Sequence, residues 1–238
     1  MRQDFAGRVA IVTGAGRGIS AATARLLARR GARVALLART RAELEQEADE
    51  LGRDQALPIV ADVADEAQVI AAFRAVRERW GPATLLASNA GALAISPLVD
   101  MDVATFDRVV AVNVRGTFLC ARELLRDAMA SRSGGSIVNV ASISGVPRTS
   151  KFPGLAAYAA SKAAVLSLTE TLAEEARPLG VRVNAVSPGS TATRMLEEAA
   201  PDARPTLTPD QVANVIVFCL SDEGSALHGA FVDAWGMP

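Results

Sequence analysis

Several residue types that build catalytic and metal sites are scarce in this chain of 238 residues. It contains one histidine, two cysteines and, counted from the sequence, two lysines, Lys151 and Lys162. With His228 alone, a histidine-based catalytic triad or a multi-histidine metal site is nearly excluded. Cys120 and Cys219 stand apart in apolar surroundings without C-x-x-C spacing, which favours two small buried side chains in a reducing compartment. We therefore expect no metal site.

The sequence also lacks net charge and long hydrophobic runs. Its 25 basic and 26 acidic residues leave a formal charge of −1, and both signs are interspersed along the chain. A nucleic-acid partner would need a clustered basic face, so none is expected. No window approaches the roughly 18 uninterrupted apolar residues of a membrane span, and the first residues show no apolar signal segment. We expect a cytoplasmic protein without a membrane partner.

The regular features of the sequence are apolar runs of strand length that alternate with longer amphipathic segments. This alternation is typical of βαβ units around a parallel sheet, and continuous apolar runs are typical of strands buried on both faces. No linker or repeat divides the chain, so we predict a single α/β domain over residues 1–238. Its fold is a doubly wound (Rossmann) one, with a central parallel sheet of about seven strands and helices on both faces. The predicted strands are 8–13, 33–38, 57–61, 84–88, 136–142, 182–187 and 230–233, and the predicted helices are 19–30, 42–51, 66–80, 104–130, 155–177 and 209–220.

A glycine-rich segment follows the first predicted strand and opens the first predicted helix. Glycines at such a turn let main-chain N–H groups approach a pyrophosphate, and the helix N-terminus favours the anion. Glycine turns also merely connect strands to helices, but the strand–turn–helix context favours a dinucleotide site. The segment consists of Thr13, Gly14, Ala15, Gly16, Arg17, Gly18, Ile19 and Ser20.

The end of the second predicted strand indicates which dinucleotide is bound. An acidic residue at this point would hydrogen-bond a free ribose 2′-hydroxyl, whereas a basic residue accommodates a 2′-phosphate. The chain has Ala38 and Arg39 there, and Arg17 of the glycine turn could reach the same phosphate. Arginine is abundant in the chain, so either residue alone could be an ordinary surface residue. Together they favour NADP(H) over NAD(H).

Tyr158 and Lys162 are four residues apart in a predicted helix and therefore share one helix face. A cation about 4 Å from a phenol, at an effective dielectric constant of about 20, favours the phenolate by about 4 kcal/mol, or roughly 3 pKa units. Such a shift would bring Tyr158 toward the range that suits proton transfer. The plain alternative is an amphipathic helix with a tyrosine at its edge and a solvated lysine. The pair does use the only tyrosine of the chain.

In this order and context, the motifs resemble the short-chain dehydrogenase/reductase family, from about residue 8 to residue 236. The resemblance implies an NADPH-dependent oxidoreductase that transfers a hydride between NADP(H) and a carbonyl or alcohol. The pattern is most similar to 3-oxoacyl-(acyl-carrier-protein) reductases, so the substrate could be a 3-oxoacyl thioester or a small ketone. The alternative is a non-enzymatic NADP(H)-binding sensor or scaffold with the same fold. An intact catalytic set favours the enzyme, because a pure binder does not require Tyr158.

The resemblance also implies a role for each site residue. Ser142 would hydrogen-bond the substrate carbonyl oxygen and Tyr158 would protonate it. Lys162 would lower the pKa of Tyr158 and bond the nicotinamide ribose, and Asn113 would hold a water that links Lys162 to solvent. The plain alternatives are a strand-end turn residue for Ser142 and a packing amide for Asn113. The implied cofactor-binding residues are Gly14, Gly16, Arg17, Gly18, Ile19, Arg39, Asp62, Val63, Asn89, Ala90, Gly91, Tyr158, Lys162, Pro188, Gly189, Thr191 and Thr193.

The chain departs from the family pattern near the cofactor and the substrate. Ser20 replaces the third turn glycine, and we expect its side chain to press on the contact between helix and strand. Ser142 and Tyr158 are 16 residues apart, with residues 151–154 as an apparent insertion, and Ser144 is a second candidate for the serine role.

The substrate segment at about residues 190–208 is short, with only 12 residues between Met195 and Thr208. A full lid helix does not fit there, so we expect an open pocket. The resemblance further implies a homo-oligomer, most simply a tetramer, in which the predicted helices 104–130 and 155–177 pair between subunits.

Overall fold

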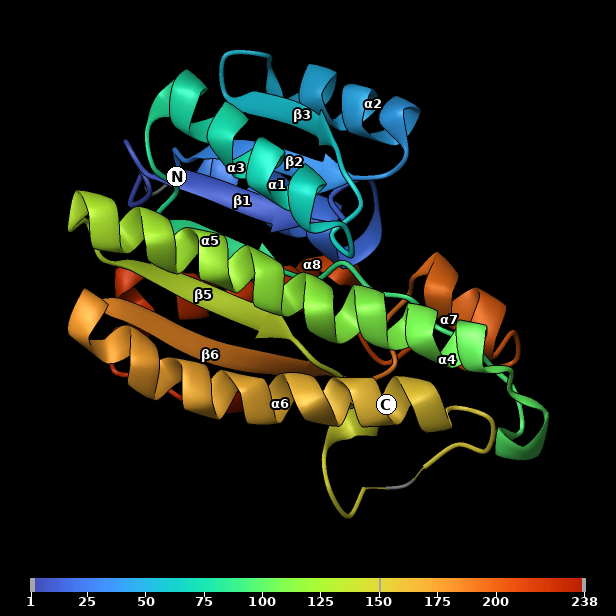
Figure 1. The fold of residues 1–238 in the computed structure, drawn as a ribbon. Helices are drawn as coiled ribbons and strands as arrows, with labels where there is room; N and C mark the ends of the chain where they lie inside the picture. Colours follow the sequence, from blue (N-terminus) through green and yellow to red (C-terminus); the bar gives the residue numbers. More distant parts are fainter. Residues whose placement is uncertain (1–2, 150, 237–238) are drawn as a thin grey trace.

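Seven parallel strands form one sheet in the computed structural model, which describes residues 3–149 and 151–236. The strand order is β3-β2-β1-β4-β5-β6-β7, and each neighbouring pair is parallel. This arrangement confirms the predicted doubly wound sheet (Figure 1). The strands are β1 (Val9–Thr13), β2 (Arg33–Ala38), β3 (Ala56–Val60), β4 (Leu85–Ser88), β5 (Gly135–Val140), β6 (Val181–Pro188) and β7 (Phe231–Ala234).

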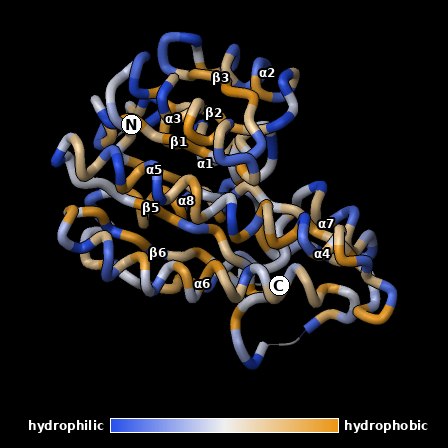
Figure 2. The backbone as a smooth tube through the Cα atoms, in the orientation of Figure 1, coloured by the Kyte–Doolittle hydropathy of each residue, from blue (hydrophilic) through white to orange (hydrophobic). Residues whose placement is uncertain are grey.

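Two apolar layers bury the two faces of the sheet. In Figure 2 apolar residues run along the strands, and hydrophilic residues lie mainly on the outer turns. On one face Leu27 and Ile216 are fully buried in the layer made by α1, α2 and α8, and on the other Phe73 and Leu124 are fully buried under α3, α5 and α6. The helices are α1 (Gly18–Arg29), α2 (Arg41–Leu51), α3 (Glu66–Trp80), α4 (Val103–Val110), α5 (Gly116–Ser131), α6 (Ala156–Ala176), α7 (Arg194–Ala199) and α8 (Pro209–Leu220).

The helical stretch after β4 differs from the single helix predicted over 104–130. It consists of α4 and α5 joined by a π-helical segment, Ala111–Arg115, which contains Asn113. π-helical turns inside α-helices widen the backbone locally and occur frequently at functional sites. At Gly116 the backbone approaches Val63 so closely that a Cβ would lie 2.7 Å from the Val63 Cγ2. Residue periodicity alone does not reveal such a local widening.

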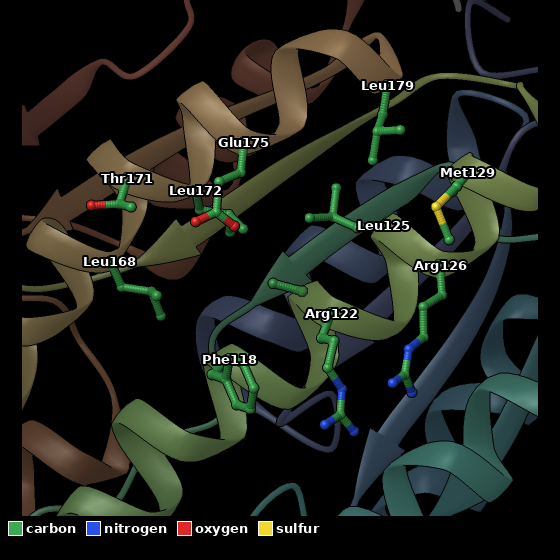
Figure 3. Close-up of a pocket in the computed structure, with 11 residues that line it drawn as sticks. Phe118, Arg122, Leu125, Arg126, Met129, Leu168, Thr171, Leu172, Glu175 and Leu179 are labelled. Carbon is green, nitrogen blue, oxygen red and sulfur yellow. The ribbon is translucent and has the colours of Figure 1, made fainter.

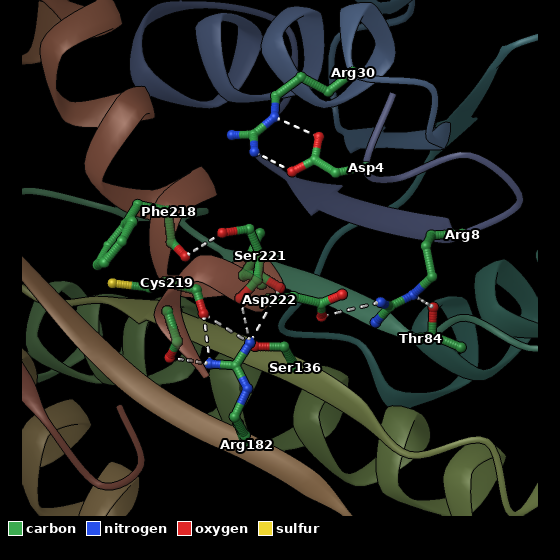
Figure 4. Close-up of polar contacts among 12 residues, drawn as sticks. Asp4, Arg8, Arg30, Thr84, Ser136, Arg182, Phe218, Cys219, Ser221 and Asp222 are labelled. Atoms are coloured by element: carbon green, nitrogen blue, oxygen red, sulfur yellow. Dashed lines mark hydrogen bonds and ion pairs between the residues drawn. The ribbon is translucent and has the colours of Figure 1, made fainter. Parts of the chain in front are cut away.

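A partly buried arginine on β6 secures the end of α8. Arg182 donates hydrogen bonds to the carbonyl oxygens of Cys219 (2.9 Å), Ser221 (2.8 Å) and Gly224 (2.9 Å) (Figure 4). The last carbonyls of a helix have no partner within the helix, and a cation there also interacts favourably with the negative end of the helix dipole. Arg182 therefore fixes α8 to the half of the sheet that carries β5 and β6.

The carboxyl ends of the parallel strands face the same edge of the sheet, where α4, α7 and the long loops lie on the right of Figure 1. The strand order reverses between β1 and β4, and open α/β sheets bind their ligands at such a switch point. Within the described part of the chain, no helix is both long enough and apolar enough to cross a membrane. No cluster of metal-ligating side chains occurs among the same residues.

Candidate active site

Three loops meet around the glycine turn that follows β1. Gly14 has a φ of +71°, and a Cβ on it would lie 3.1 Å from the Cα of Ala90, in the loop after β4. Gly18 has a φ of +59°, and a Cβ on it would lie 3.4 Å from the Cγ2 of Thr193, in the segment after β6. Only glycine adopts these conformations and approaches without strain. The turn therefore leaves main-chain groups at the N-terminus of α1 accessible to a ligand.

Ser20 connects this turn to the loop after β4 rather than pressing on the helix contact. Its hydroxyl donates to the Thr13 carbonyl oxygen (2.9 Å) and accepts from the Asn89 Nδ2 (2.6 Å). The Thr13 Oγ1 accepts from the main-chain N–H groups of Asn89 and Ala90, both at 3.0 Å. The Ser20 hydroxyl therefore satisfies two polar groups where the helix meets the strand. Ile19 packs against the core beside them.

The two arginines predicted to favour a 2′-phosphate flank the same end of the sheet. Arg39 follows β2 and is exposed, with no acidic partner among the described residues. Arg17 forms an ion pair with Glu43 of α2, with the Nη1 3.3 Å from the Oε1. The sequence analysis missed Glu43, whose carboxylate also lies against Gly16.

Asp62 and Val63, which the resemblance implies as cofactor-binding residues, are placed by local contacts. Asp62 accepts a hydrogen bond from the Ala64 main-chain N–H (2.9 Å), and Val63 is buried against Gly116. Both residues follow β3, at the same sheet edge as the glycine turn.

The segment after β6 is built from the predicted residues Pro188, Gly189, Thr191 and Thr193. β6 ends at Pro188, and a Cβ on Gly189 would lie 3.0 Å from the Trp235 carbonyl oxygen. The Thr191 hydroxyl donates to the Gly189 carbonyl oxygen (3.1 Å), and Thr193 caps the N-terminus of α7. These contacts hold the segment over the glycine turn, next to Gly18.

Ser142 and Tyr158 face each other despite the long loop between them. Ser142 follows β5, and its hydroxyl accepts from the Ser144 main-chain N–H (3.2 Å). A hydrogen bond with Ser142 acts to lower the pKa of Tyr158, but burial has the larger effect and raises it. Of the two candidate serines, Ser142 is the one that acts on the pKa of this phenol. Gly145 allows this approach, since a Cβ on it would lie 2.6 Å from the Ala163 main-chain nitrogen in α6.

Lys162 is buried on the same helix face, with 5% of its surface exposed. Its ammonium donates to the Val140 carbonyl oxygen (2.7 Å) and lies 5.8 Å from the centroid of the Tyr158 ring. Burial lowers the pKa of Lys162 to about 8. The expected lowering of the Tyr158 pKa by this lysine is not found, because the ammonium is directed to the end of β5 and the net shift of the phenol is upward.

Asn113 joins the loop after β4 to α6. Its Oδ1 accepts from the Ala92 N–H (2.7 Å), and its Nδ2 donates to the Ala92 carbonyl oxygen and to the Ser161 hydroxyl, both at 2.9 Å. The Ser161 hydroxyl in turn donates to the Tyr158 carbonyl oxygen (2.7 Å). A Cβ on Gly91 would lie 3.5 Å from the Asn113 Oδ1. Ser161 is a site residue that the sequence analysis missed, although it directly precedes the lysine of the Y-x-x-x-K motif.

The inserted loop between Ser142 and Tyr158 is held by Lys151. Its ammonium donates to the carbonyl oxygens of Ser144 (2.7 Å) and Val146 (2.6 Å) and to the Thr149 hydroxyl. Ser150 lies outside the described residues. Lys151 therefore ties the later part of this loop back to its beginning, close to the end of β5.

The short segment between β6 and α8 is also a closed loop. Thr191 and Leu207 form an isolated parallel bridge, and the main-chain N–H groups of Thr206 and Leu207 both donate to the Ser190 carbonyl oxygen. Between these ends, α7 spans six residues, Arg194–Ala199. This helix is shorter than a full lid helix, as the short interval between Met195 and Thr208 predicted.

Together these elements place a phenol, a hydroxyl and a buried ammonium beside a cradle of main-chain N–H groups. The cradle at Gly14 and Gly18 would be filled by a side chain, so it fits the pyrophosphate of a dinucleotide. Next to it, Ser142 and Tyr158 can bind and protonate an oxygen atom. The buried ammonium of Lys162 can supply a positive charge near the phenol.

Comparison with known proteins adds direct evidence. The sequence matches the family described as "short chain dehydrogenase" over residues 8–204. It is 37% identical over 249 residues to cis-4-hydroxycyclohexanecarboxylate dehydrogenase of Sinomonas cyclohexanicum, covering 98% of this chain and 96% of the relative.

Two solved structures are similar over nearly the full length. A short-chain type dehydrogenase/reductase from Mycobacterium marinum has a TM-score of 0.93 at 31% identity, covering 98% of this chain and 96% of that chain. A 3-ketoacyl-(acyl-carrier-protein) reductase from Brucella melitensis, crystallised with NADH, has a TM-score of 0.89 at 35% identity and covers 98% of each chain.

Proposed function

Because the chain belongs to the short-chain dehydrogenase family and is therefore a nicotinamide-dependent oxidoreductase, we propose that it reduces a carbonyl compound with NADPH. The observation that carries this proposal is the buried Lys162 ammonium 5.8 Å from the centroid of the Tyr158 ring, together with the influence of Ser142 on the pKa of that phenol. The bound cofactor would supply the hydride. Every other step falls to side chains of this chain.

Ser142 would donate its hydroxyl proton as a hydrogen bond to the substrate carbonyl oxygen, and Tyr158 would protonate that oxygen as it gains negative charge. The phenol of Tyr158, whose pKa burial raises further, is protonated near neutral pH and therefore carries the proton that it would donate. Lys162, positively charged below about pH 8, would stabilise the phenolate that is left. Asn113 would position the loop that carries Gly91 and Ala92, through its bonds to Ala92 and Ser161.

We further propose that the cofactor-binding residues predicted from the sequence line one continuous site. Gly14, Gly16 and Gly18 would approach the pyrophosphate, and Thr191 and Thr193 would face the nicotinamide half. Arg17 and Arg39 lie where the second strand ends without a carboxylate, which supports NADPH over NADH.

The proposed substrate is a carbonyl compound or an alcohol. The inserted loop approaches the loop after β4 at Gly154 and Ile95, and both loops carry exposed apolar side chains, with Phe152 66% exposed and Ile95 50% exposed. A cyclic ketone is supported by the similarity to the hydroxycyclohexanecarboxylate dehydrogenase, and a 3-oxoacyl thioester by the similarity to the 3-ketoacyl reductase.

A homotetramer is proposed from the outer surfaces of α5 and α6. A groove of about 330 Å³ lies between these helices, lined by apolar side chains that include Leu125, Leu168 and Leu172 (Figure 3). At its edges Phe118 is 43% exposed and Met129 is 63% exposed. Exposed apolar surface of this kind is typical of subunit contacts, and closed symmetry is the common form of assembly. Sedimentation at micromolar concentration, with Met129→Glu as the disrupting variant, would test it.

The proposed reaction is tested by NADPH oxidation with a panel of cyclic ketones, aldehydes and 3-oxoacyl thioesters. Tyr158→Phe should lower kcat by about 10²- to 10⁴-fold, because it removes the proton donor, while the Kd for NADPH changes little. Ser142→Ala should also lower kcat, and Ser144→Ala is the matched control at a serine that does not contact the phenol. If Tyr158→Phe retained more than a tenth of the rate with chemistry limiting, the assignment of the proton donor would be wrong.

A further inference from the structure

Glu43 has the sequence position of a helix cap but does not act as one. Thr40 precedes α2 and Glu43 stands three residues later, the spacing of a capping box in which the two side chains bond each other's main-chain N–H groups. The Thr40 side chain makes no capping hydrogen bond, and Glu43 makes none to Thr40. Thr208 and Gln211, with the same spacing at the start of α8, form the complete box.

The carboxylate of Glu43 is directed instead to the glycine turn. Its Oε1 lies 3.3 Å from the Arg17 Nη1. Its Oε2 lies only 2.6 Å from the position that a Cβ on Gly16 would take. Glu43 therefore occupies the side of the turn that faces the end of β2, where the adenosine ribose of a dinucleotide would bind.

This placement opposes the arginines that favour a 2′-phosphate. Of the two, Arg17 already has a carboxylate partner, and Arg39 has no acidic partner among the described residues. A 2′-phosphate would have to take Arg17 from Glu43 and would experience repulsion from its charge. The side chains of Arg17 and Glu43 are 56% and 33% exposed, so the ion pair is weak and can be displaced.

We propose that Glu43 is a specificity-determining residue that weakens the preference for NADPH over NADH. When a 2′-phosphate binds Arg17, Glu43 turns back toward the main-chain N–H of Thr40, which is its half of a capping box. When the ribose carries a free 2′-hydroxyl, the carboxylate remains beside Gly16, where it can accept that hydroxyl's hydrogen bond. The proposal rests on the dinucleotide site of the proposed function.

The test compares ligands that differ only in the 2′-phosphate. Calorimetry with 2′,5′-ADP and 5′-AMP measures binding at the adenosine end without any turnover. Glu43→Gln should tighten 2′,5′-ADP by about tenfold, because Arg17 is then free to bind the phosphate. The affinity for 5′-AMP should stay the same or fall. NADPH and NADH titrations should show the same change in their Kd ratio.

Glu50→Gln is the matched control, since it removes one charge from the same helix about two turns away, where Glu50 pairs with Arg25. It should leave both affinities unchanged. Thermal unfolding of each variant establishes that it folds.

A double-mutant cycle with Arg17→Gln separates competition from simple repulsion. If Glu43 acts by holding Arg17, the gain from Glu43→Gln should shrink to less than threefold in the Arg17→Gln background. An equal gain in both backgrounds, or an unchanged ratio of 2′,5′-ADP to 5′-AMP affinity in Glu43→Gln, would overturn the proposal. Failure of the unmodified protein to bind any of the four ligands would instead overturn the proposed function.

Discussion

Lys162 carries a buried charge, and its replacement should change how the stability of the protein depends on pH. Burial lowers the pKa of Lys162 from 10.5 to about 8 in the folded protein. The folded state therefore releases this proton at a lower pH than the unfolded chain. Between about pH 8 and pH 10.5 the unfolded chain binds more protons, so stability rises with pH through this window.

The size of the effect follows from the two pKa values. Integrated from pH 7 to pH 9.5, the difference in proton binding stabilises the fold by about 2 kcal/mol at the higher pH. Lys162→Met removes this contribution along with the bond to Val140, so the variant's curve should lack the rise. Above pH 9.5 the phenol of Tyr158 opposes the trend, because its raised pKa makes the fold lose stability as the unfolded phenol ionises.

Urea unfolding at pH 7.0, 8.0 and 9.5, at fixed protein concentration and without cofactor, measures the free energy of unfolding of the unmodified protein and of Lys162→Met. Lys151→Met removes the exposed lysine in the same way and controls for the loss of one ammonium group. The difference in free energy of unfolding between the unmodified protein and Lys162→Met should grow by about 2 kcal/mol from the lowest to the highest pH. Curves that stay parallel within about 0.5 kcal/mol, given ordinary extrapolation error, would refute the burial of a titrating ammonium.

Two further variants test the surroundings of the site. Ser161→Ala should lower the free energy of unfolding by about 1–2 kcal/mol, since it leaves the buried Asn113 amide without one partner, and urea unfolding beside Ser161→Thr checks this. Deleting residues 197–200, which comprise the end of α7 and the residue after it, should lower kcat/KM by less than about a hundredfold across a size series of ketones, because so short a segment does not seal the site. A larger loss would identify a working lid.

The sheet was predictable because two independent sequence signals, apolar runs and glycines at helix ends, locate its strands. Continuous apolar runs such as β1 and β6 must be buried on both faces, and Gly31 and Gly180, both with positive φ, end helices where the pattern indicates. Strand ends moved by one or two residues, since pairing with neighbours rather than hydropathy decides them. The π-helical segment at Asn113 escaped prediction because it depends on contacts from Ala92 and Val63, far away in the sequence.

The site was predictable only as far as its motifs are local. Tyr158 and Lys162 share a helix, so their common face followed from spacing. The direction of the Lys162 ammonium did not, because the Val140 carbonyl oxygen that accepts its hydrogen bond lies on β5. Likewise Arg17 could be assigned to a phosphate, but its pairing with Glu43 requires that α1 and α2 lie side by side.

The closed loop between Ser190 and Leu207 also makes this edge of the sheet a site for protein engineering. Its two ends are already joined by the bridge of Thr191 and Leu207 and by the bonds to the Ser190 carbonyl oxygen, independently of what lies between them. For a flexible loop with fixed ends, each doubling of length costs only about 0.6 kcal/mol of chain entropy. Longer recognition segments can therefore be grafted in place of α7 while the sheet and the glycine turn keep their stability.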